Sequence, residues 1–414
     1  MKMLVESTQR AGNEKQLPTA TADQPIRVGQ KIRRGGRIFA TAMPTLWPQM
    51  MLPWVRQEAL PYPFEEPGAH YLYSTRNGIY TVARMMGLAG QEVLFPAYFC
   101  GVELDALLAA GVRPRFFPVH GRMRIDPDEV AAQIGPETKA IYLIHYAGFP
   151  GPVEELKELC RNRGLRLIED CALALLSCLG AKPLGSFGEA AVFCLYKTLP
   201  APNGGVVLLR GGEPVNWPEG QRPSLTSLAA RLVPSLLMNL EMRGSAGGRL
   251  LRQGVVGLGK AAVHTAGTER VAVGTQEFDP SHVGLGMSDC SRVVLKAQDF
   301  PAITGKRRNN YSHLLERLRG LSTPIFGELP PGVCPLFYPL QVRNKKAVHA
   351  ELMARGVEAI NFWSLHHPLL PPGVFPEVDE LRQTVLWLPC HQDLTESAID
   401  RLAAVMHEVV REVN

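Results

Sequence analysis

The feature that most constrains the fold is a regular alternation of short apolar runs and amphipathic segments between residues 71 and 209. The apolar runs predict strands, and the segments between them, with apolar residues spaced i, i+3, i+4, predict helices. We expect strands over 92–95, 114–119, 140–145, 165–168, 190–195 and 206–209, and helices over 81–88, 102–110, 126–134 and 153–163. Asp126 before Pro127 suits a helix start, and Gly164 suits a helix end. This order predicts an α/β fold with a mostly parallel sheet wrapped by helices.

The alternation breaks over residues 211–283 and returns near the C-terminus. There we expect a long helix over 294–318, a strand over 336–342, and helices over 346–355 and 396–413. Within the break, residues 224–242 form an amphipathic segment that predicts a helix packed on the body or on a partner. We therefore expect an N-terminal arm over 1–45 with a basic cluster at 31–37, a large domain over 46–290 containing the 211–283 insertion, and a small α+β domain over 291–414.

Composition excludes several classes of protein. Hydrophobic residues make up 46% and charged residues 20% of the 414 residues, which suits a globular protein with a core and excludes a disordered chain. The net charge of +5 gives no nucleic-acid signature. No apolar run is long enough to span a membrane, and polar residues 1–30 predict no signal peptide. Scattered cysteines without a CxxC pair favour reduced thiols in the cytoplasm and no metal site.

Residues that can carry chemistry follow the expected strands. His145, Glu169–Asp170 and Lys197 each stand at a strand end, where open α/β sheets bind ligands. A lysine amine forms a Schiff base with an aldehyde, and an aspartate can hold a heterocyclic ring nitrogen protonated. Taken singly, a helix cap for Asp170 and a solvated charge for Lys197 stay open.

A candidate anion site precedes the first helix of this region. Ser74, Thr75 and Arg76 lead into a helix that we expect to begin near Ile79, and free N–H groups at a helix start bind anions. A plain helix cap is the alternative.

The order of segments resembles one family. VLFPAYFCG is followed by RFFPV, TKAIYLIHYAG, LIEDCA, LGSFGEAAVF and LPCHQDL. This series resembles the DegT-type sugar aminotransferases, which are pyridoxal 5'-phosphate (PLP) enzymes of fold type I with a three-layer large domain. The resemblance extends over residues 70–210 and returns over 285–410.

The resemblance implies roles for particular residues. Lys197 matches the lysine that forms the Schiff base, and Asp170 matches the aspartate that pairs with the pyridinium nitrogen. Thr75 and Arg76, with Ser74 before them, match the phosphate-binding segment. The aromatic residue that stacks on the cofactor falls at Cys100 by strict count, so Phe99 or Tyr98 would have to replace it, and we expect Phe99.

Three positions depart from the family pattern. Leu173 stands where the family has Gln or His, and Cys194 stands where related chains have a phosphate-binding Ser. The family's Asn that reaches across the dimer is missing from the stretch beginning at Gly284. Since a hydrogen bond contributes about 1 kcal/mol and one to a charged group about 1.5–3 kcal/mol, these losses predict weaker cofactor binding.

The resemblance implies a cytoplasmic, homodimeric aminotransferase of sugar biosynthesis. Its small-molecule substrates would be an amino acid donor and a keto acceptor, a sugar nucleotide or a related intermediate. Two alternatives stay open: a PLP enzyme of another reaction type, such as elimination or carbon–carbon chemistry, and a degenerate scaffold or regulator. His145 is open between a structural and a catalytic role, whereas a packed or surface pair is favoured for His366–His367 and a buried apolar role for Cys171.

Overall fold

The computed structural model describes residues 38–52, 57, 59–210, 217, 220–243 and 278–413. The basic cluster at 31–37 and residues 244–277 of the expected insertion lie outside the described residues. Within the described part of the chain, no helix is both long and apolar enough to cross a bilayer.

A seven-stranded sheet forms the centre of the fold, in the order β1-β9-β8-β5-β4-β2-β3. Its strands are β1 (His70–Leu72), β2 (Glu92–Pro96), β3 (Arg113–Phe117), β4 (Thr138–Ile144), β5 (Arg166–Cys171), β8 (Ala190–Cys194) and β9 (Gly205–Leu209). The pairs from β3 through β8 are parallel, whereas β9 is antiparallel to both β8 and β1. The mostly parallel sheet is therefore confirmed. The connection from β8 to β9 is too short for a crossover, so β9 turns back.

Helices follow the parallel strands as the periodicity predicts. They are α1 (Thr75–Met85), α2 (Val102–Ala109), α3 (Pro127–Ala132) and α4 (Val153–Arg163). The expected caps are confirmed: the Asp126 carboxylate accepts a hydrogen bond from the Asp128 N–H, and Gly164 is left-handed with φ 63°. Helix α1 packs on the sheet face formed by Val192 and Val207.

The expected start of α1 near Ile79 is wrong, because the helix begins at Thr75. Gly78 lowers the apparent helix propensity of this stretch. In the structure the missing side chain is what allows the contact: a Cβ on Gly78 would lie 2.4 Å from Cγ2 of Val207. Packing of α1 on β9 thus places a glycine inside the helix.

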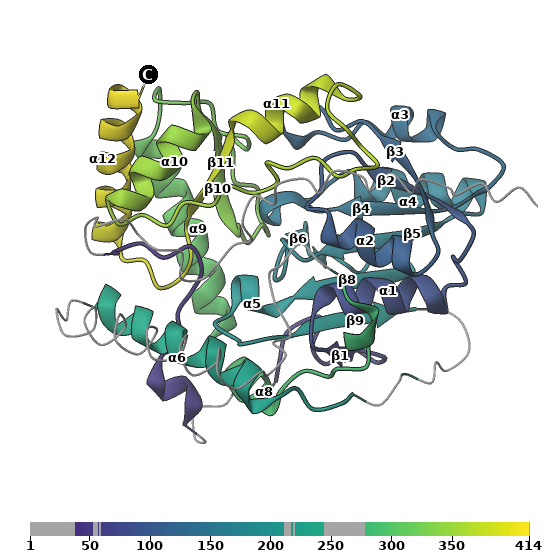
Figure 1. The fold of residues 1–414 in the computed structure, drawn as a ribbon, viewed down its shortest axis with the longest axis horizontal. Coiled ribbons are helices and arrows are strands. Elements are labelled where there is room, and N and C mark those ends of the chain that lie inside the picture. The colour runs from purple at the N-terminus through teal and green to yellow at the C-terminus, as the bar shows by residue number, and fades with distance from the viewer. Residues whose placement is uncertain are drawn as a thin grey trace, which may run out of the picture.

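The C-terminal part carries a second, two-stranded antiparallel sheet, β10–β11, which Figure 1 shows beside the central sheet with α9, α10 and α12 around it. Its elements are α8 (Asp289–Lys296), α9 (Phe300–Arg317), β10 (Phe337–Gln341), α10 (Lys345–Ala354), α11 (Pro376–Thr384), β11 (Val385–Pro389) and α12 (Glu396–Val413). One long helix over 294–318 is a wrong prediction: Asp299 caps α9 separately, and Pro301 lacks the N–H that would continue α8. The domain boundary between residues 290 and 291 stays a prediction, and α8 runs across it.

The amphipathic segment of the insertion is helix α6 (Leu225–Met242). Two hydrogen bonds tie α6 to the segment that precedes the central sheet. Ser235 Oγ accepts from the Leu46 N–H at 2.8 Å, and Asn239 Nδ2 donates to Thr45 Oγ1 at 2.9 Å. The prediction of a helix packed on the body is confirmed.

Candidate active site

Neighbouring strands bring Asp170 and Lys197 to one edge of the sheet. Asp170 lies in β5 and pairs in parallel register with Val192 of β8. Strand β8 ends at Cys194 and continues directly into α5 (Leu195–Thr198), the single helical turn that carries Lys197. Since both strands run in the same direction, their carboxyl ends meet at the same edge.

Asp170 is a buried acid held by two donors. Tyr142 donates its hydroxyl to Oδ2 at 2.6 Å, and the Ala172 N–H donates to Oδ1 at 2.8 Å. Burial raises the pKa of Asp170, and these two hydrogen bonds together with Lys197 and His145 oppose that rise. Burial and Asp170 hold the pKa of Tyr142 well above its usual value, so its hydroxyl stays protonated as a donor.

The candidate anion site lies beside this edge. Ser74 precedes α1 and Thr75 is its first residue, so Thr75 and Arg76 lie inside the helix rather than before it. Thr75 Oγ1 donates to the Phe193 carbonyl at 3.0 Å, which ties the start of α1 to β8. A Cβ on Gly205 would lie 2.6 Å from the Thr75 nitrogen, so only glycine lets β9 come this close. The first N–H groups of α1 have no partner within their own helix.

The three departures from the family pattern surround the same edge. Cys194 is fully buried; burial raises the pKa of its thiol, and Lys197 and Thr75 oppose the rise. Leu173 is buried in the turn after β5 and offers no hydrogen bond. The stretch beginning at Gly284 lies beside the strand before α1, where the Leu285 carbonyl accepts from the Tyr73 N–H at 2.9 Å.

Phe99 has aromatic partners in the core. Its ring stacks on Phe116 with centroids 5.7 Å apart and meets Phe95 edge-on at 5.2 Å. Stacking of Phe99 on a cofactor therefore stays a prediction. For the next residue, Cys100, burial raises the pKa of the thiol to about 12, and Lys197 opposes that rise.

Glu103 is a buried carboxyl group that the sequence reasoning missed. It stands in the first turn of α2, and its Oε1 accepts from the Cys100 N–H at 2.7 Å. Burial, with the charge of Asp170, raises its pKa to about 7, and the Cys100 N–H and Lys197 oppose the rise. An acidic residue three positions after Cys100 at a helix start was the available signal, because first-turn acids hydrogen-bond back to the preceding backbone.

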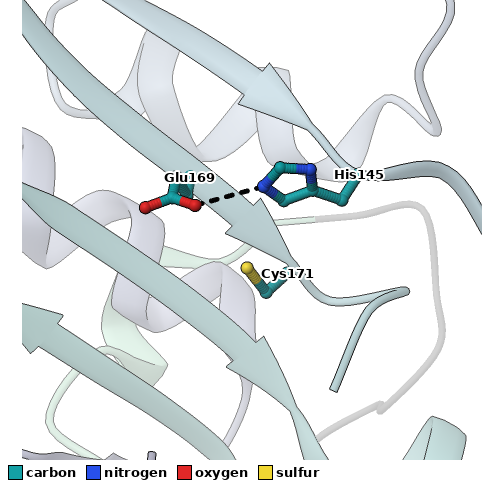
Figure 2. Close-up of side chains that lie close together, drawn as sticks. All are labelled: His145, Glu169 and Cys171. Carbon is teal, nitrogen blue, oxygen red and sulfur yellow. Dashed lines mark hydrogen bonds and ion pairs between the residues drawn. The ribbon is translucent and has the colours of Figure 1, made fainter. Parts of the chain in front are cut away.

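Glu169 and His145 lie near Asp170 but brace the backbone. Glu169 accepts from the N–H groups of Gly185, Phe187 and Gly188 at 2.6–2.8 Å and lies 3.2 Å from Nε2 of His145 (Figure 2). His145 Nδ1 accepts from the Gly151 N–H at 3.1 Å. Both ring nitrogens and both carboxylate oxygens are thus engaged, although Cys171 lies close enough to complete a metal-ligand trio. These contacts agree with a structural role for His145, which is one of the two roles that the sequence leaves open.

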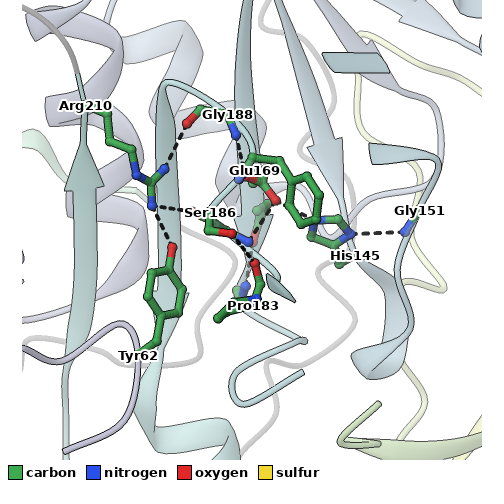
Figure 3. Close-up of polar contacts among 12 residues, drawn as sticks. Tyr62, His145, Gly151, Glu169, Pro183, Ser186, Gly188 and Arg210 are labelled. Carbon is green, nitrogen blue, oxygen red and sulfur yellow. Dashed lines mark hydrogen bonds and ion pairs between the residues drawn. The ribbon is translucent and has the colours of Figure 1, made fainter. Parts of the chain in front are cut away.

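Arg210 holds the same loop, which joins β7 (Lys182–Pro183) to β8 and supplies the three N–H groups that Glu169 accepts from. Arg210 donates to the carbonyls of Gly185 and Gly188 and to the Tyr62 hydroxyl, at 2.6–2.8 Å (Figure 3). The loop between β7 and β8 is therefore held by an acid at its N–H groups and by a guanidinium at its carbonyls.

His366 and His367 lie between the C-terminal part and α2. His366 Nε2 is 2.7 Å from Asp379 Oδ1, and His367 Nε2 is 3.0 Å from Asp105 Oδ1. Each imidazole is packed at hydrogen-bond distance from an aspartate carboxylate, in agreement with the favoured prediction.

The fold is that of a class of solved enzymes, the fold type I aminotransferases. The aminotransferase TlmJ from Streptoalloteichus hindustanus superposes with a TM-score of 0.60 and 21% identity over 84% of this chain and 87% of that chain. Helicobacter pylori PseC, an aminotransferase of pseudoaminic acid biosynthesis, gives 0.64 and 17% over 91% and 100%. The PLP form of the sugar aminotransferase Spr1654 from Streptococcus pneumoniae gives 0.64 and 14% over 92% and 100%.

The resemblance to one family within this class is confirmed: residues 72–216 match the DegT/DnrJ/EryC1/StrS aminotransferase family. A dTDP-4-dehydro-2,3,6-trideoxy-D-glucose 4-aminotransferase from Saccharopolyspora spinosa is 35% identical over 33% of this chain and 36% of the relative. GDP-perosamine synthase from Vibrio cholerae is 30% identical over 29% and 33%. The chain thus spans about a third of the length of these two relatives. A UDP-N-acetyl-3-dehydro-alpha-D-glucosamine 3-aminotransferase from Acidithiobacillus ferrooxidans is 25% identical over 78% of both chains.

Proposed function

We propose that the protein is a PLP-dependent aminotransferase that moves an amino group from an amino acid to the keto group of a sugar nucleotide. The observation that carries this proposal is the pairing of β5 with β8, which brings the Asp170 carboxylate and the Lys197 amine to one sheet edge next to the start of α1. The names of the sequence relatives, which act on dTDP-, UDP- and GDP-linked sugars or their products, support the substrate class.

The residues present fit the cofactor. A buried carboxylate with two donors suits a protonated ring nitrogen, and a nearby lysine suits the aldehyde. The helix start held against Gly205, with Ser74, Thr75 and Arg76, suits the phosphate. When bound, PLP supplies an electron sink for the substrate's α-carbon.

The chain's own groups then have distinct tasks. Asp170, held by Tyr142 and the Ala172 N–H, would hold the protonated ring nitrogen. The Lys197 amine takes the proton from the donor's α-carbon and returns a proton to the acceptor carbon, which is general acid–base catalysis. Cys194, three residues before this lysine, offers a weaker thiol where related chains have a hydroxyl donor, so a bound phosphate would depend more on the α1 backbone.

An absorption spectrum with added PLP, followed by borohydride reduction and peptide mapping, tests the proposal. We expect a visible band and a reduced adduct on Lys197, and an aminated sugar nucleotide after addition of donor and acceptor. Lys197→Ala should abolish all three, whereas Lys139→Ala, at an exposed strand position, should abolish none. A wild-type chain without band or adduct at saturating PLP contradicts the proposal; a band with a deaminated or carbon-extended product redirects it to another PLP reaction.

A second candidate function is a scaffold or regulator of the same fold. Buried Leu173 and Cys194, which remove two polar contacts to the cofactor, favour it. If this function is right, the chain folds, and adding PLP changes neither its stability nor its binding to partners.

Assembly and location complete the proposal. We infer a homodimer, because sites of this class lie between two subunits; a monomeric mass at micromolar concentration contradicts it. The eight cysteines are unpaired in the described residues, which agrees with a reducing, cytoplasmic location. Domains over 46–290 and 291–414, after an arm over 1–45, are proposed with it; limited proteolysis would test them.

A further inference from the structure

A buried arginine of the C-terminal part reaches the turn that carries Lys197. Arg307 lies in α9, is fully buried, and donates hydrogen bonds with all three guanidinium nitrogens. Nη2 donates to the Thr198 carbonyl at 3.0 Å, Nη1 to the Leu336 carbonyl at 3.0 Å, and Nε to Gln392 Oε1 at 2.8 Å. No carboxylate is among these hydrogen-bond partners, so a full positive charge is satisfied by carbonyl oxygens alone.

Gln392 closes this network. Its Nε2 donates to the same Thr198 carbonyl at 3.0 Å, while its Oε1 accepts from Arg307. The carbonyl of the residue directly after Lys197 thus receives two donors from two separate segments of the C-terminal part. Because a buried guanidinium is costly unless every donor is satisfied, this arrangement tolerates little displacement.

Besides the packing of the buried Leu195 and Leu199, few hydrogen bonds hold this end of the turn. Helix α5 is one turn long, Leu195–Thr198, and is closed by the Leu199 N–H donating to the Leu195 carbonyl at 2.7 Å. A single turn is not stable in isolation, so its geometry depends on what holds its ends. Thr75 bonds to Phe193 at the β8 side, and Arg307 with Gln392 hold the far side.

We propose that Arg307 is a positioning residue for Lys197: shared with Gln392, its guanidinium fixes the Thr198 carbonyl and so aims the lysine that the proposed function uses. The inference rests on that proposed function for its catalytic consequence. Its structural consequence, an ordered turn, is a property of the chain without cofactor. Displacing a reacting group by about 1 Å can cost about 100-fold in rate, so an unfixed turn should lower kcat more than it changes substrate binding.

The test uses Arg307→Met, which keeps an unbranched, flexible side chain of shorter length and removes the charge and all the donors. Arg308→Met is the matched control, because Arg308 is the next residue of α9 and donates to the carbonyls of Pro330 and Val333, away from the turn. In the full chain without PLP, hydrogen exchange at residues 195–199 should become about tenfold faster in Arg307→Met and stay unchanged in Arg308→Met. With PLP, donor and acceptor, kcat should fall about 10- to 100-fold with KM within about threefold.

Gln392→Leu provides a second variant where Arg307→Met does not fold. It removes one of the two donors to Thr198, and it should speed exchange at the same residues. The proposal is overturned if the folded variants exchange at wild-type rates over 195–199, or if Arg308→Met produces the same changes. A wild-type chain that forms no PLP adduct overturns the proposed function, while the exchange experiment still decides whether Arg307 orders the turn.

Discussion

Glu103→Gln should stabilise the protein in a way that depends on pH. Glu103 is a buried acid at the start of α2 whose Oε1 accepts from the Cys100 N–H. Glutamine has nearly the same shape and keeps an acceptor oxygen for that N–H. The substitution therefore removes the ionisation of the side chain and leaves its main hydrogen bond in place.

The magnitude follows from the raised pKa. The ordinary value of 4.5 rises to about 7 in the folded chain, chiefly through burial. The folded state binds more protons than the unfolded state between these values, so the contribution of Glu103 is complete below pH 4.5 and is lost as the pH rises through 7. At about 1.4 kcal/mol per pKa unit, ionised Glu103 costs the folded protein about 3 kcal/mol above pH 7.

Urea unfolding of the unloaded chain at mildly acidic and mildly alkaline pH measures this difference. Glu103→Gln should match the wild type near pH 4 and exceed it by about 3 kcal/mol near pH 8. Glu154→Gln is the control, because Glu154 also stands in the first turn of a helix, α4, but is exposed. Equal gains at both pH values, or a loss near pH 8, would refute the assignment of a buried, ionising Glu103.

Three further substitutions test the site and the core. Tyr142→Phe removes the donor to Asp170, and since hydrogen bonds to charged groups contribute about 1.5–3 kcal/mol, PLP titration should show about 10- to 100-fold weaker binding. His391→Gln should resist acid: burial lowers the pKa of His391 from 6.5 to about 4, so the wild type alone loses about 3 kcal/mol of unfolding free energy as the pH falls through this window. Gly205→Ala should lower the thermal midpoint, because its Cβ would press on the Thr75 nitrogen at a cost of about 1–3 kcal/mol.

Matched variants separate these effects from general damage. Tyr146→Phe removes a similarly buried hydroxyl that donates to the Tyr98 carbonyl at 2.6 Å, and it should leave PLP affinity unchanged. Gly305→Ala, in α9 with open space around its Cβ position, should raise the thermal midpoint slightly. If Tyr146→Phe weakens PLP binding as much as Tyr142→Phe, the role given to Tyr142 is wrong.

The sequence predicts the sheet because its signal is local. The apolar runs of β4, β5 and β8 are buried on both faces, so periodicity and turn residues find them, and with them the strand-end positions of Asp170 and Lys197. The family match over residues 72–216 confirms the resemblance that orders these segments.

What the sequence does not predict depends on distant residues. Helix α1 includes Gly78 because Val207, far along the chain, fills the space above it. The position of Glu103 at a helix start signals its hydrogen bond to the Cys100 N–H but not its burial, which only the assembled fold produces. The break between α8 and α9 is different: Asp299 and Pro301 signal it locally, but the continuous apolar periodicity outweighed them.

Two adjacent acids of β5 make contacts on opposite faces of the sheet. Glu169 faces the loop it braces, and Asp170 faces α1 and the lysine, because side chains alternate between the two faces of a strand. Inserting or deleting one residue within β5 would exchange the faces of the two acids, leaving the brace without its acceptor and the proposed cofactor site without its carboxyl group.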